Sequence, residues 1–254
     1  AVTQASLIPH FYRSILRREP DAAGQAFWES EVARVAALGA DLNEVWYAMA
    51  MSFLASAEYR NFNRDSGGFL TDLYAAFFNR APDASGFAFY AGQLASGMPR
   101  EVVLAAFLFS EEFTNRTRSM FGTPAVRAEV NMVTDFYRGL LWRLPDSSGF
   151  AFWIQQFRSA QCQGAGAVYV QVEAISNAFA EGAEYNGAGK SNAEFVGDLY
   201  NAFLRRGGDL TGVQFWISEL NRGARTRSQA RQAFLASPEF SARVAQVLAL
   251  GCAR

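Results

Sequence analysis

An eleven-residue phrase occurs four times in this chain at a nearly constant spacing. It reads "REPDAAGQAFW" from residue 18, "RAPDASGFAFY" from 80, "RLPDSSGFAFW" from 143 and "RGGDLTGVQFW" from 206. Its glycines are 62, 63 and 63 residues apart: Gly24, Gly86, Gly149 and Gly212. So regular a period indicates stacked copies of one supersecondary unit. We therefore expect four repeats of about 63 residues, at residues 1–66, 67–130, 131–192 and 193–254.

The segment ahead of each phrase predicts a helix. In "FLTDLYAAFFN" the residues Leu70, Leu73, Tyr74, Phe77 and Phe78 follow the i, i+3, i+4, i+7, i+8 spacing of one apolar helix face. An arginine six residues before each glycine is expected to close this helix, because positive charge favours the negative end of the helix dipole. These arginines are Arg18, Arg80, Arg143 and Arg206. A proline that follows in three copies opposes continuation of the helix.

The second half of the phrase predicts the start of another helix. An aspartate three residues before each glycine is expected to cap it: Asp21, Asp83, Asp146 and Asp209. Calcium binding is the less favoured alternative, because "PDAAG" supplies one carboxylate where a calcium loop needs several oxygens. The glycine then falls at the third helical position, where a missing side chain permits close contact between helices. The aromatic pair after it is expected in the core rather than on a sugar-stacking platform.

A second signature, of the form F-x-x-S-x-E followed by an aromatic residue, closes each repeat. Its glutamates are Glu58, Glu112, Glu184 and Glu239. A serine before a helix start with a glutamate in the first turn is ordinary capping chemistry. We expect each arginine of the phrase to bind the glutamate of its own repeat with two prongs, with the nearby aspartate as the competing partner. Arg80→Ala should then markedly lower the melting temperature, provided that the pair is partly buried.

The distance from the glycine to this glutamate alternates between the copies. It is 34, 26, 35 and 27 residues, so the first and third copies are about eight residues longer. The alternation indicates an ancestral pair that was itself duplicated, and predicts a pseudo-twofold relation between residues 1–130 and 131–254. The extra lengths near residues 36 and 160 are expected to form protruding loops or longer helices.

Composition narrows the class of protein. Half of the 254 residues are apolar and 15% are aromatic, which is ample for an ordered core, and we expect an all-α fold. The net charge of −1 argues against a nucleic-acid partner. No run of about 18 apolar residues predicts a membrane-spanning helix. The single histidine, His10, has no nucleophile motif beside it and is not expected to be catalytic. We expect no enzyme activity, cofactor or metal site.

The two cysteines and two of the tryptophans are candidates for particular roles. Cys162 and Cys252 lie 90 positions apart, and form either one disulfide in an oxidising compartment or two unrelated buried thiols. With one histidine they cannot supply a zinc site from the usual ligands. Trp46 and Trp142 stand outside the repeated aromatic pair, and we expect them to be exposed interaction residues.

The phrase, the helix before it and the F-x-x-S-x-E-F signature after it resemble the domain-of-unknown-function 4214 family of bacteria. The resemblance covers nearly the whole chain, in four copies. It extends more distantly to the helical linker domain of cyanobacterial phycobilisomes. It implies an all-helical module, often found in tandem in secreted or surface-associated proteins, with no catalytic residues to carry over. Bilin attachment is not implied, because the repeated motif contains no cysteine.

Two functions follow as expectations. The first is a non-enzymatic structural or assembly protein that docks onto other protein subunits, self-assembly included, at the bacterial cell surface or in the periplasm. The alternative is a carbohydrate-binding module for envelope or extracellular polysaccharide. An open groove lined by aromatic residues would favour sugar binding, whereas flat apolar faces would favour assembly.

Overall fold

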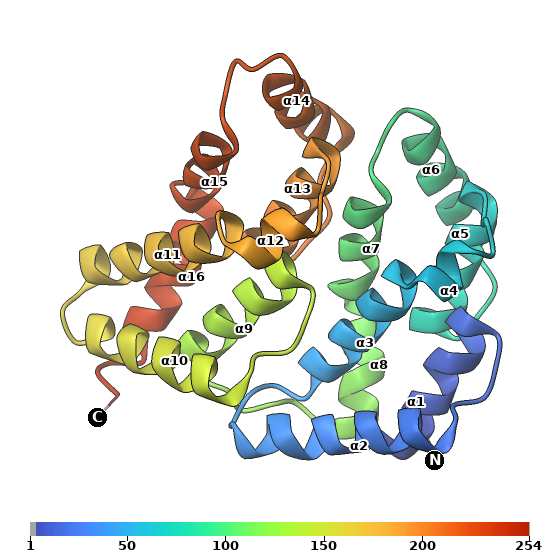
Figure 1. Ribbon diagram of the computed structural model, residues 1–254, viewed down its shortest axis with the longest axis horizontal. Helices are drawn as coiled ribbons and strands as arrows, with labels where there is room; N and C mark the ends of the chain where they lie inside the picture. The colour runs from blue at the N-terminus through green and yellow to red at the C-terminus, as the bar shows by residue number, and fades with distance from the viewer. Residues whose placement is uncertain (1–3, 254) are drawn as a thin grey trace. The chain divides into compact units, whose positions relative to one another are not determined.

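The structure is a computed structural model, and it describes residues 4–253 (Figure 1). The expected all-α fold is confirmed: the regular elements of the described residues are helices, with no strand among them. The chain divides into two compact units, Ala1–Pro124 and Ala125–Arg254. This boundary lies six residues before the one expected from the repeat spacing, in the extended segment between α8 and α9.

The first unit begins with a helix that ends in a π-helical turn, and the same pair recurs at its middle. Its elements are α1 (Gln4–Phe11), η1 (Tyr12–Leu16), α2 (Ala22–Ala37), α3 (Asn43–Ala55), α4 (Ala57–Arg60), α5 (Ser66–Leu73), η2 (Tyr74–Phe78), α6 (Ala84–Ala95), α7 (Arg100–Leu108) and α8 (Glu111–Phe121). Phe77 of η2 packs edge-on against Phe113 of α8, with ring centroids 5.0 Å apart. Large aromatic side chains of this kind fill the core of the unit.

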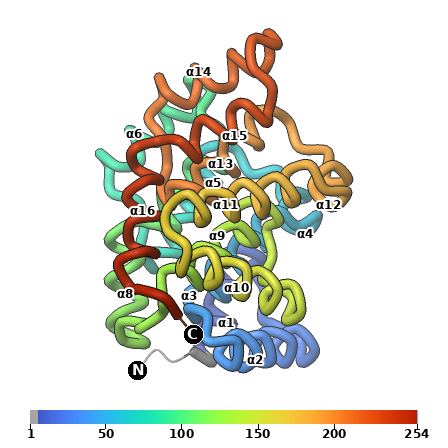
Figure 2. The backbone as a smooth tube through the Cα atoms, turned by 90° about the vertical axis from the view of Figure 1, so that its left-hand side faces the viewer, coloured from blue at the N-terminus to red at the C-terminus, as the bar shows by residue number. Residues whose placement is uncertain are grey.

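The second unit repeats this order of elements, except that α9 is one continuous helix where the first unit has α1 and η1. They are α9 (Ala128–Leu141), α10 (Ser147–Gln161), α11 (Ala165–Ala180), α12 (Ala183–Gly187), α13 (Asn192–Leu199), η3 (Tyr200–Leu204), α14 (Leu210–Asn221), α15 (Arg227–Leu235) and α16 (Pro238–Ala249). Helices α9, α10 and α11 lie side by side (Figure 1). Figure 2 shows α16 crossing α11, with which it is in contact in the same unit. Phe203 of η3 packs against Phe240 of α16 at 5.2 Å, as Phe77 packs against Phe113.

The helix ahead of each phrase ends one residue earlier than expected. A residue with a left-handed backbone, φ between 50° and 58°, terminates it: Arg17, Asn79, Trp142 or Arg205. The repeated arginine is the next residue in each copy. A left-handed backbone cannot continue a right-handed helix. The arginine therefore follows the helix end rather than forming it.

The extra residues of the first and third copies lengthen helices. α2 and α10 have 16 and 15 residues, whereas α6 and α14 have 12 each. α3 and α11 have 13 and 16 residues, against nine in α7 and nine in α15. Longer helices are therefore the form that the extra length takes, one of the two forms expected. Each phrase is accompanied by four helical segments, whereas about three were expected.

Candidate functional site

The repeated arginines pair with the glutamates of the closing signature in all four copies, as predicted. Arg80 Nε and Nη2 donate to the two carboxylate oxygens of Glu112, each at 2.9 Å. Arg18 binds Glu58 in the same two-pronged way, at 2.7 and 3.1 Å. The other two pairs have the same geometry: Arg143 with Glu184, and Arg206 with Glu239. Each arginine thereby ties the end of one helix to the start of another 32 to 41 residues away.

A tyrosine ring lies beneath each of these arginines. The guanidinium carbon of Arg80 is 5.0 Å from the ring centre of Tyr74. The distances at Tyr12, Tyr137 and Tyr200 are 5.0, 5.2 and 5.4 Å. The hydroxyl of the same tyrosine reaches the glycine of the phrase, since a Cβ added at Gly24, Gly86 or Gly149 would overlap it. The glycine is therefore required for close contact with the tyrosine, and the joint is a structural unit.

The four aspartates of the phrase cap the following helices. Asp21, Asp83, Asp146 and Asp209 each accept a hydrogen bond from the backbone N–H of their glycine, at 2.8 to 2.9 Å. Asp83 also accepts from Arg80 at 3.1 Å, and Asp146 from Arg143 at 3.4 Å. These bonds, first of all the one from the Gly86 N–H, lower the pKa of Asp83 to about 2. Capping is thus the role that the structure gives these carboxylates.

The exposure of the arginine–glutamate pairs changes the expected effect of Arg80→Ala. The side chains of Arg80 and Glu112 are 39% and 45% exposed, and the other three pairs are similar. An ion pair as exposed as this contributes less than about 1 kcal/mol, because water screens it. The large loss of stability expected for a partly buried pair therefore does not apply.

The expectation that both aromatics of the phrase enter the core was wrong for the first of them. Phe27, Phe89, Phe152 and Phe215 are 47–59% exposed, whereas Trp28 is buried and its three counterparts are half-buried. Adjacent residues of a helix point about 100° apart, so only one of the two can face the core squarely. Trp28 and Val35, seven residues apart, lie on the buried face of α2, and Phe27 lies off that face.

The two tryptophans expected at the surface are both used inside the fold. Trp46 is fully buried and stacks on Phe121 of α8, with ring centroids 5.8 Å apart. Its position in "NEVWYAMAM" is within an almost wholly apolar helix, which was the signal for burial. Trp142 is half-buried, and its Nε1 donates to Asp198 Oδ1 at 2.7 Å. Neither is an exposed interaction aromatic.

Two positions before each tyrosine of the repeat lies a polar residue that was not predicted as a site, half-buried in the first copy and buried in the other three. These residues are His10, Asp72, Asp135 and Asp198. The signal was available, because these residues share the period of the glycines, although the first copy has a histidine. Asp72 accepts from Tyr59 at 2.7 Å and from Arg64 at 2.9 Å. Asp198 accepts from Tyr185 and Lys190, both at 2.7 Å.

Asp135 has a different environment, with three arginines around one fully buried carboxylate. Arg138 donates to it at 2.7 Å, and Arg205 and Arg243 also donate to it. Burial alone would raise the pKa of Asp135, but the three guanidinium groups outweigh burial and hold this pKa well below its ordinary value. This is the most strongly charged buried cluster that the described residues form.

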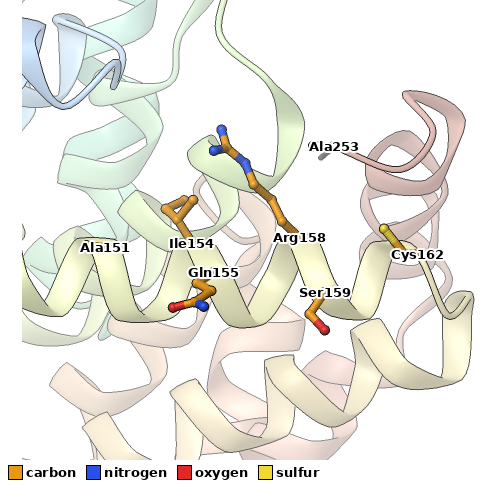
Figure 3. Close-up of a pocket in the computed structure, with 7 residues that line it drawn as sticks. All are labelled: Ala151, Ile154, Gln155, Arg158, Ser159, Cys162 and Ala253. Atoms are coloured by element: carbon orange, nitrogen blue, oxygen red, sulfur yellow. The ribbon is translucent and has the colours of Figure 1, made fainter.

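Cys162 and Cys252 form a disulfide, one of the two alternatives expected for them. Their Cα atoms are 4.7 Å apart, and the bond ties the end of α10 to the segment after α16. Beside it lies an open pocket of about 500 Å³. Figure 3 shows that its lining comes from α10, including Arg158, and from Ala253 of the C-terminal segment. Nothing in this lining resembles a catalytic arrangement.

Across residues 4–253, His, Cys, Asp and Glu side chains do not gather in any group that could hold a metal ion. The helices of the same stretch include none with the length and apolar character needed to cross a membrane.

The fold and the recurring joint define an all-helical protein built around a repeated helix–helix connection. The chain belongs to the family described as Domain of unknown function (DUF4214), whose model matches residues 50–117 and 175–244. These two stretches contain the second and fourth phrases, whereas the phrases at residues 18 and 143 lie outside them. No curated protein matches the chain. No solved structure matches it either.

Proposed function

We propose that this protein is a non-enzymatic assembly module that docks onto other protein subunits. The observation that carries the proposal is the set of four exposed phenylalanines at equivalent positions of the repeated phrase: Phe27, Phe89, Phe152 and Phe215. Exposed apolar side chains scattered singly are normal on protein surfaces. Four at the same position of a motif, on four helices, are better explained by a shared use.

Small exposed residues lie beside two of these phenylalanines, and the helix of one of them carries no charge. Phe89 is surrounded by the exposed residues Ser85, Ala88 and Gly92. Its helix, α6, has no charged side chain, and none of its residues is fully buried. Phe27 on α2 is flanked by exposed Ala23, Ala26 and Ser30 in the same way. Small side chains allow another helix to approach closely, and a phenylalanine supplies an apolar anchor, since aromatic residues are enriched at protein interfaces.

The disulfide supports a location outside the cytoplasm. Disulfides form and persist in oxidising compartments, such as the periplasm or the cell surface, and are rare in the cytosol. Its two cysteines are the only ones in the chain, so the pairing leaves no free thiol among the described residues. We therefore place the proposed assembly role at the bacterial cell surface or in the periplasm.

The proposal extends to the copies that the family match does not cover. The phrases at residues 18 and 143 carry the same arginine–glutamate pair, aspartate cap and tyrosine–glycine contact as the matched ones. We take them as diverged copies of the same module, which makes four. A distant likeness to the phycobilisome linker domain accords with a scaffold that holds other subunits.

Polysaccharide binding is the alternative, and one observation favours it. An exposed phenylalanine ring beside hydroxyl or amide side chains is a surface on which a sugar ring can stack, and Gln155 lies one turn from Phe152. Against it, the pockets beside Cys162, His10 and Glu219 have no phenylalanine, tyrosine or tryptophan in their linings. Docking through flat helix faces therefore remains the first choice.

A variant with all four phenylalanines changed to glutamine tests the proposal. Because these side chains are exposed, each change should alter the free energy of unfolding by less than about 0.5 kcal/mol. Proteins that cross-link to the wild-type chain in its native source should be lost from this variant, as identified by mass spectrometry. Val170→Gln is the matched control, since Val170 is 64% exposed but lies outside the repeated phrase. An unchanged set of partners, or a monomer that binds a glycan array, would contradict the proposal.

A further inference from the structure

One backbone oxygen of the first unit is shared by two side chains that can both carry a positive charge. The carbonyl oxygen of Ala76 in η2 lies 2.9 Å from His10 Nε2 of α1 and 3.2 Å from Arg116 Nη1 of α8. The same guanidinium nitrogen donates to the carbonyl oxygen of Phe77 at 2.9 Å. The elements α1, η2 and α8 therefore meet at this oxygen, and the His10 ring and the Arg116 guanidinium are close neighbours.

The hydrogen bond to Ala76 determines which nitrogen of the neutral His10 ring carries the proton. A carbonyl oxygen only accepts, so Nε2 donates and Nδ1 is the nitrogen that takes up a second proton. The ring is half-buried and lines an open pocket of about 400 Å³, so a proton from solvent can reach it. Once protonated, the ring is a cation beside Arg116.

The charged groups around His10 disfavour its protonated form. Arg116 is half-buried and, among the residues that the structure describes, no carboxylate pairs with it. Arg13 of η1 adds a weaker repulsion, although it is exposed and paired with Glu19. Arg80 lines the same pocket but is already paired with carboxylates. The charge that His10 would meet is thus mainly that of Arg116.

No carboxylate from the other neighbouring elements offsets this repulsion, in the part of the chain that the structure describes. Asp72 of α5 binds Tyr59 and Arg64 instead. Thr71 of α5, which lines the pocket, is neutral. The helix α2 also packs on α1, but none of its charged side chains acts on the ring. Protonation of His10 therefore brings two positive charges together without a counter-charge.

These surroundings lower the pKa of His10. Burial is the largest cause, and the positive charges of Arg116 and Arg13 add to it. The carbonyl oxygens of Ala75 and Ala76 act in the opposite direction, because they favour a charged ring, but they do not reverse the shift. The folded first unit consequently prefers the neutral ring.

The second unit has the opposite chemistry at the equivalent place. Asp135 stands where the first unit has His10, and it is bound by Arg243, the counterpart of Arg116. Arg243 also donates to two backbone carbonyl oxygens of η3, as Arg116 does to two of η2. Here the cation faces an anion whose pKa is held well below its ordinary value. Mild acid therefore leaves this junction intact.

The open space beside His10 also has a local cause. In the second unit Gly139 allows α9 and η3 so close an approach that a Cβ would lie 2.5 Å from the backbone of Ala202. The first unit has Ser14 at this position, and Ser14 lines the pocket. We attribute the open space to this side chain, which needs room between η1 and η2.

We propose that His10 is an acid-sensitive switch of the first unit: a proton on its ring loosens the junction of α1, η2 and α8, while the second unit keeps its packing. The contacts of Phe77 are the ones released, since its ring lies 6.1 Å from that of Phe11 in α1 and 5.0 Å from that of Phe113 in α8. The switch does not depend on the proposed docking role.

The direction of the pH effect follows from the neutral ring being favoured in the fold. The unfolded chain takes up the proton at the ordinary pKa of 6.5, and the folded unit only at a lower pH. The stability of the first unit is therefore greatest above about pH 6.5 and declines as the pH falls below that value.

The first measurement uses the fact that His10 is the only histidine in the chain. The ring NMR signals of the full-length protein, followed from about pH 8 to pH 4.5, report the titration of this residue alone. The pKa of His10 should lie below 6.5, and Arg116→Gln should raise it by removing the neighbouring cation. Arg13→Gln is the matched control and should raise it less, because Arg13 is exposed. A wild-type pKa at or above 6.5 would overturn the proposal.

Hydrogen exchange with mass spectrometry locates the loosening within the full chain. Between about pH 7 and pH 5, after correction for the intrinsic pH dependence of exchange, the amides of η2 should lose protection by at least about threefold. Those of η3, its counterpart in the second unit, should keep their protection. His10→Gln is neutral at every pH and can still donate to Ala76, so it should abolish the loss in η2. An equal loss in η2 and η3, or a loss that persists in His10→Gln, would also overturn the proposal.

Discussion

Asp135 and Asp198 occupy the same position in the repeat and are both fully buried. The pKa values of their carboxyl groups nevertheless move in opposite directions. Burial raises the pKa of Asp198, and one lysine with two neutral donors does not reverse this effect. Three arginines reverse it at Asp135, whose pKa is lowered. The number of positive charges that reach a buried carboxylate therefore decides the direction in which its pKa moves.

Asp135→Asn should be among the most destabilising single changes in the chain. It leaves three arginines without their counter-charge in the core, and breaking a buried ion pair in this way costs about 3–5 kcal/mol. Arg80→Ala, at an exposed pair, should cost less than about 1 kcal/mol. Urea unfolding followed by circular dichroism measures both. Equal losses of unfolding free energy in the two variants would show that burial does not determine how much these ion pairs contribute to stability.

The acid side of the stability profile should change with the same variant. Because the folded-state pKa of Asp135 lies below its unfolded value, its contribution is present above about pH 4 and is lost as the pH falls through the lowered pKa. Asp135→Asn should therefore lose stability at pH 7 but show a shallower decline below pH 4. A decline as steep as that of the wild type would assign the acid sensitivity to other carboxylates.

At the scale of elements, the close approach of α9 and η3 depends on one glycine. Gly139→Ala would place a Cβ 2.5 Å from the backbone of Ala202, so the two elements must separate. We expect a loss of about 1–3 kcal/mol in the free energy of unfolding, as for other overpacked sites. Gly92→Ala on α6 is the matched control. No atom lies within 4 Å of its added Cβ, and alanine should gain up to about 1 kcal/mol in a helix.

Thermal unfolding of the two glycine variants measures this difference directly. If Gly139→Ala were as stable as the wild type, α9 and η3 would not need close contact. Ser14 is the residue of the first unit that corresponds to Gly139. It would then not explain why the first unit has an open pocket, lined in part by His10 and Ser14, at this place.

At the scale of the whole molecule, the disulfide is confined to the second of the two units. It joins two cysteines 90 positions apart, both of which lie in the second unit. We therefore expect the fold of residues 125–253 to depend on it more than that of residues 4–124. A disulfide that closes so long a loop contributes typically about 2–4 kcal/mol. Reduction should destabilise the second unit by about this amount and leave the first unit unchanged.

Hydrogen exchange with mass spectrometry resolves the two units within the full chain. After reduction, amides of α10, α11 and α16 should exchange faster, while those of α3 and α7 should keep their rates. The double variant Cys162→Ser, Cys252→Ser should reproduce this pattern and be indifferent to reductant. Equal acceleration in both units would mean that they unfold together.

Local patterns in the sequence were enough for much of the architecture. The helix stripes, the aspartate and serine caps and the glycine period predicted an all-helical chain and the positions of its recurring joints. The pairing of Arg18 with Glu58, and its three counterparts, also followed, because complementary charges at helix ends must meet if the repeat folds back on itself. Such features depend on residues a few positions apart, or on a spacing that recurs.

Tertiary packing decided which of these residues are buried, and so which are available for function. A phenylalanine and a tryptophan side by side look alike as core residues, and only the direction of the helix against its neighbours turns Phe27 outward and Trp28 inward. Trp46 is buried because α3 is covered all round at residues 44–51, which its own composition could suggest but not establish. The cluster around Asp135 joins residues as far apart as Arg138 and Arg243, so no local pattern contains it. Burial is a property of contacts between distant segments. It also decides how much an ion pair formed between those segments contributes to stability.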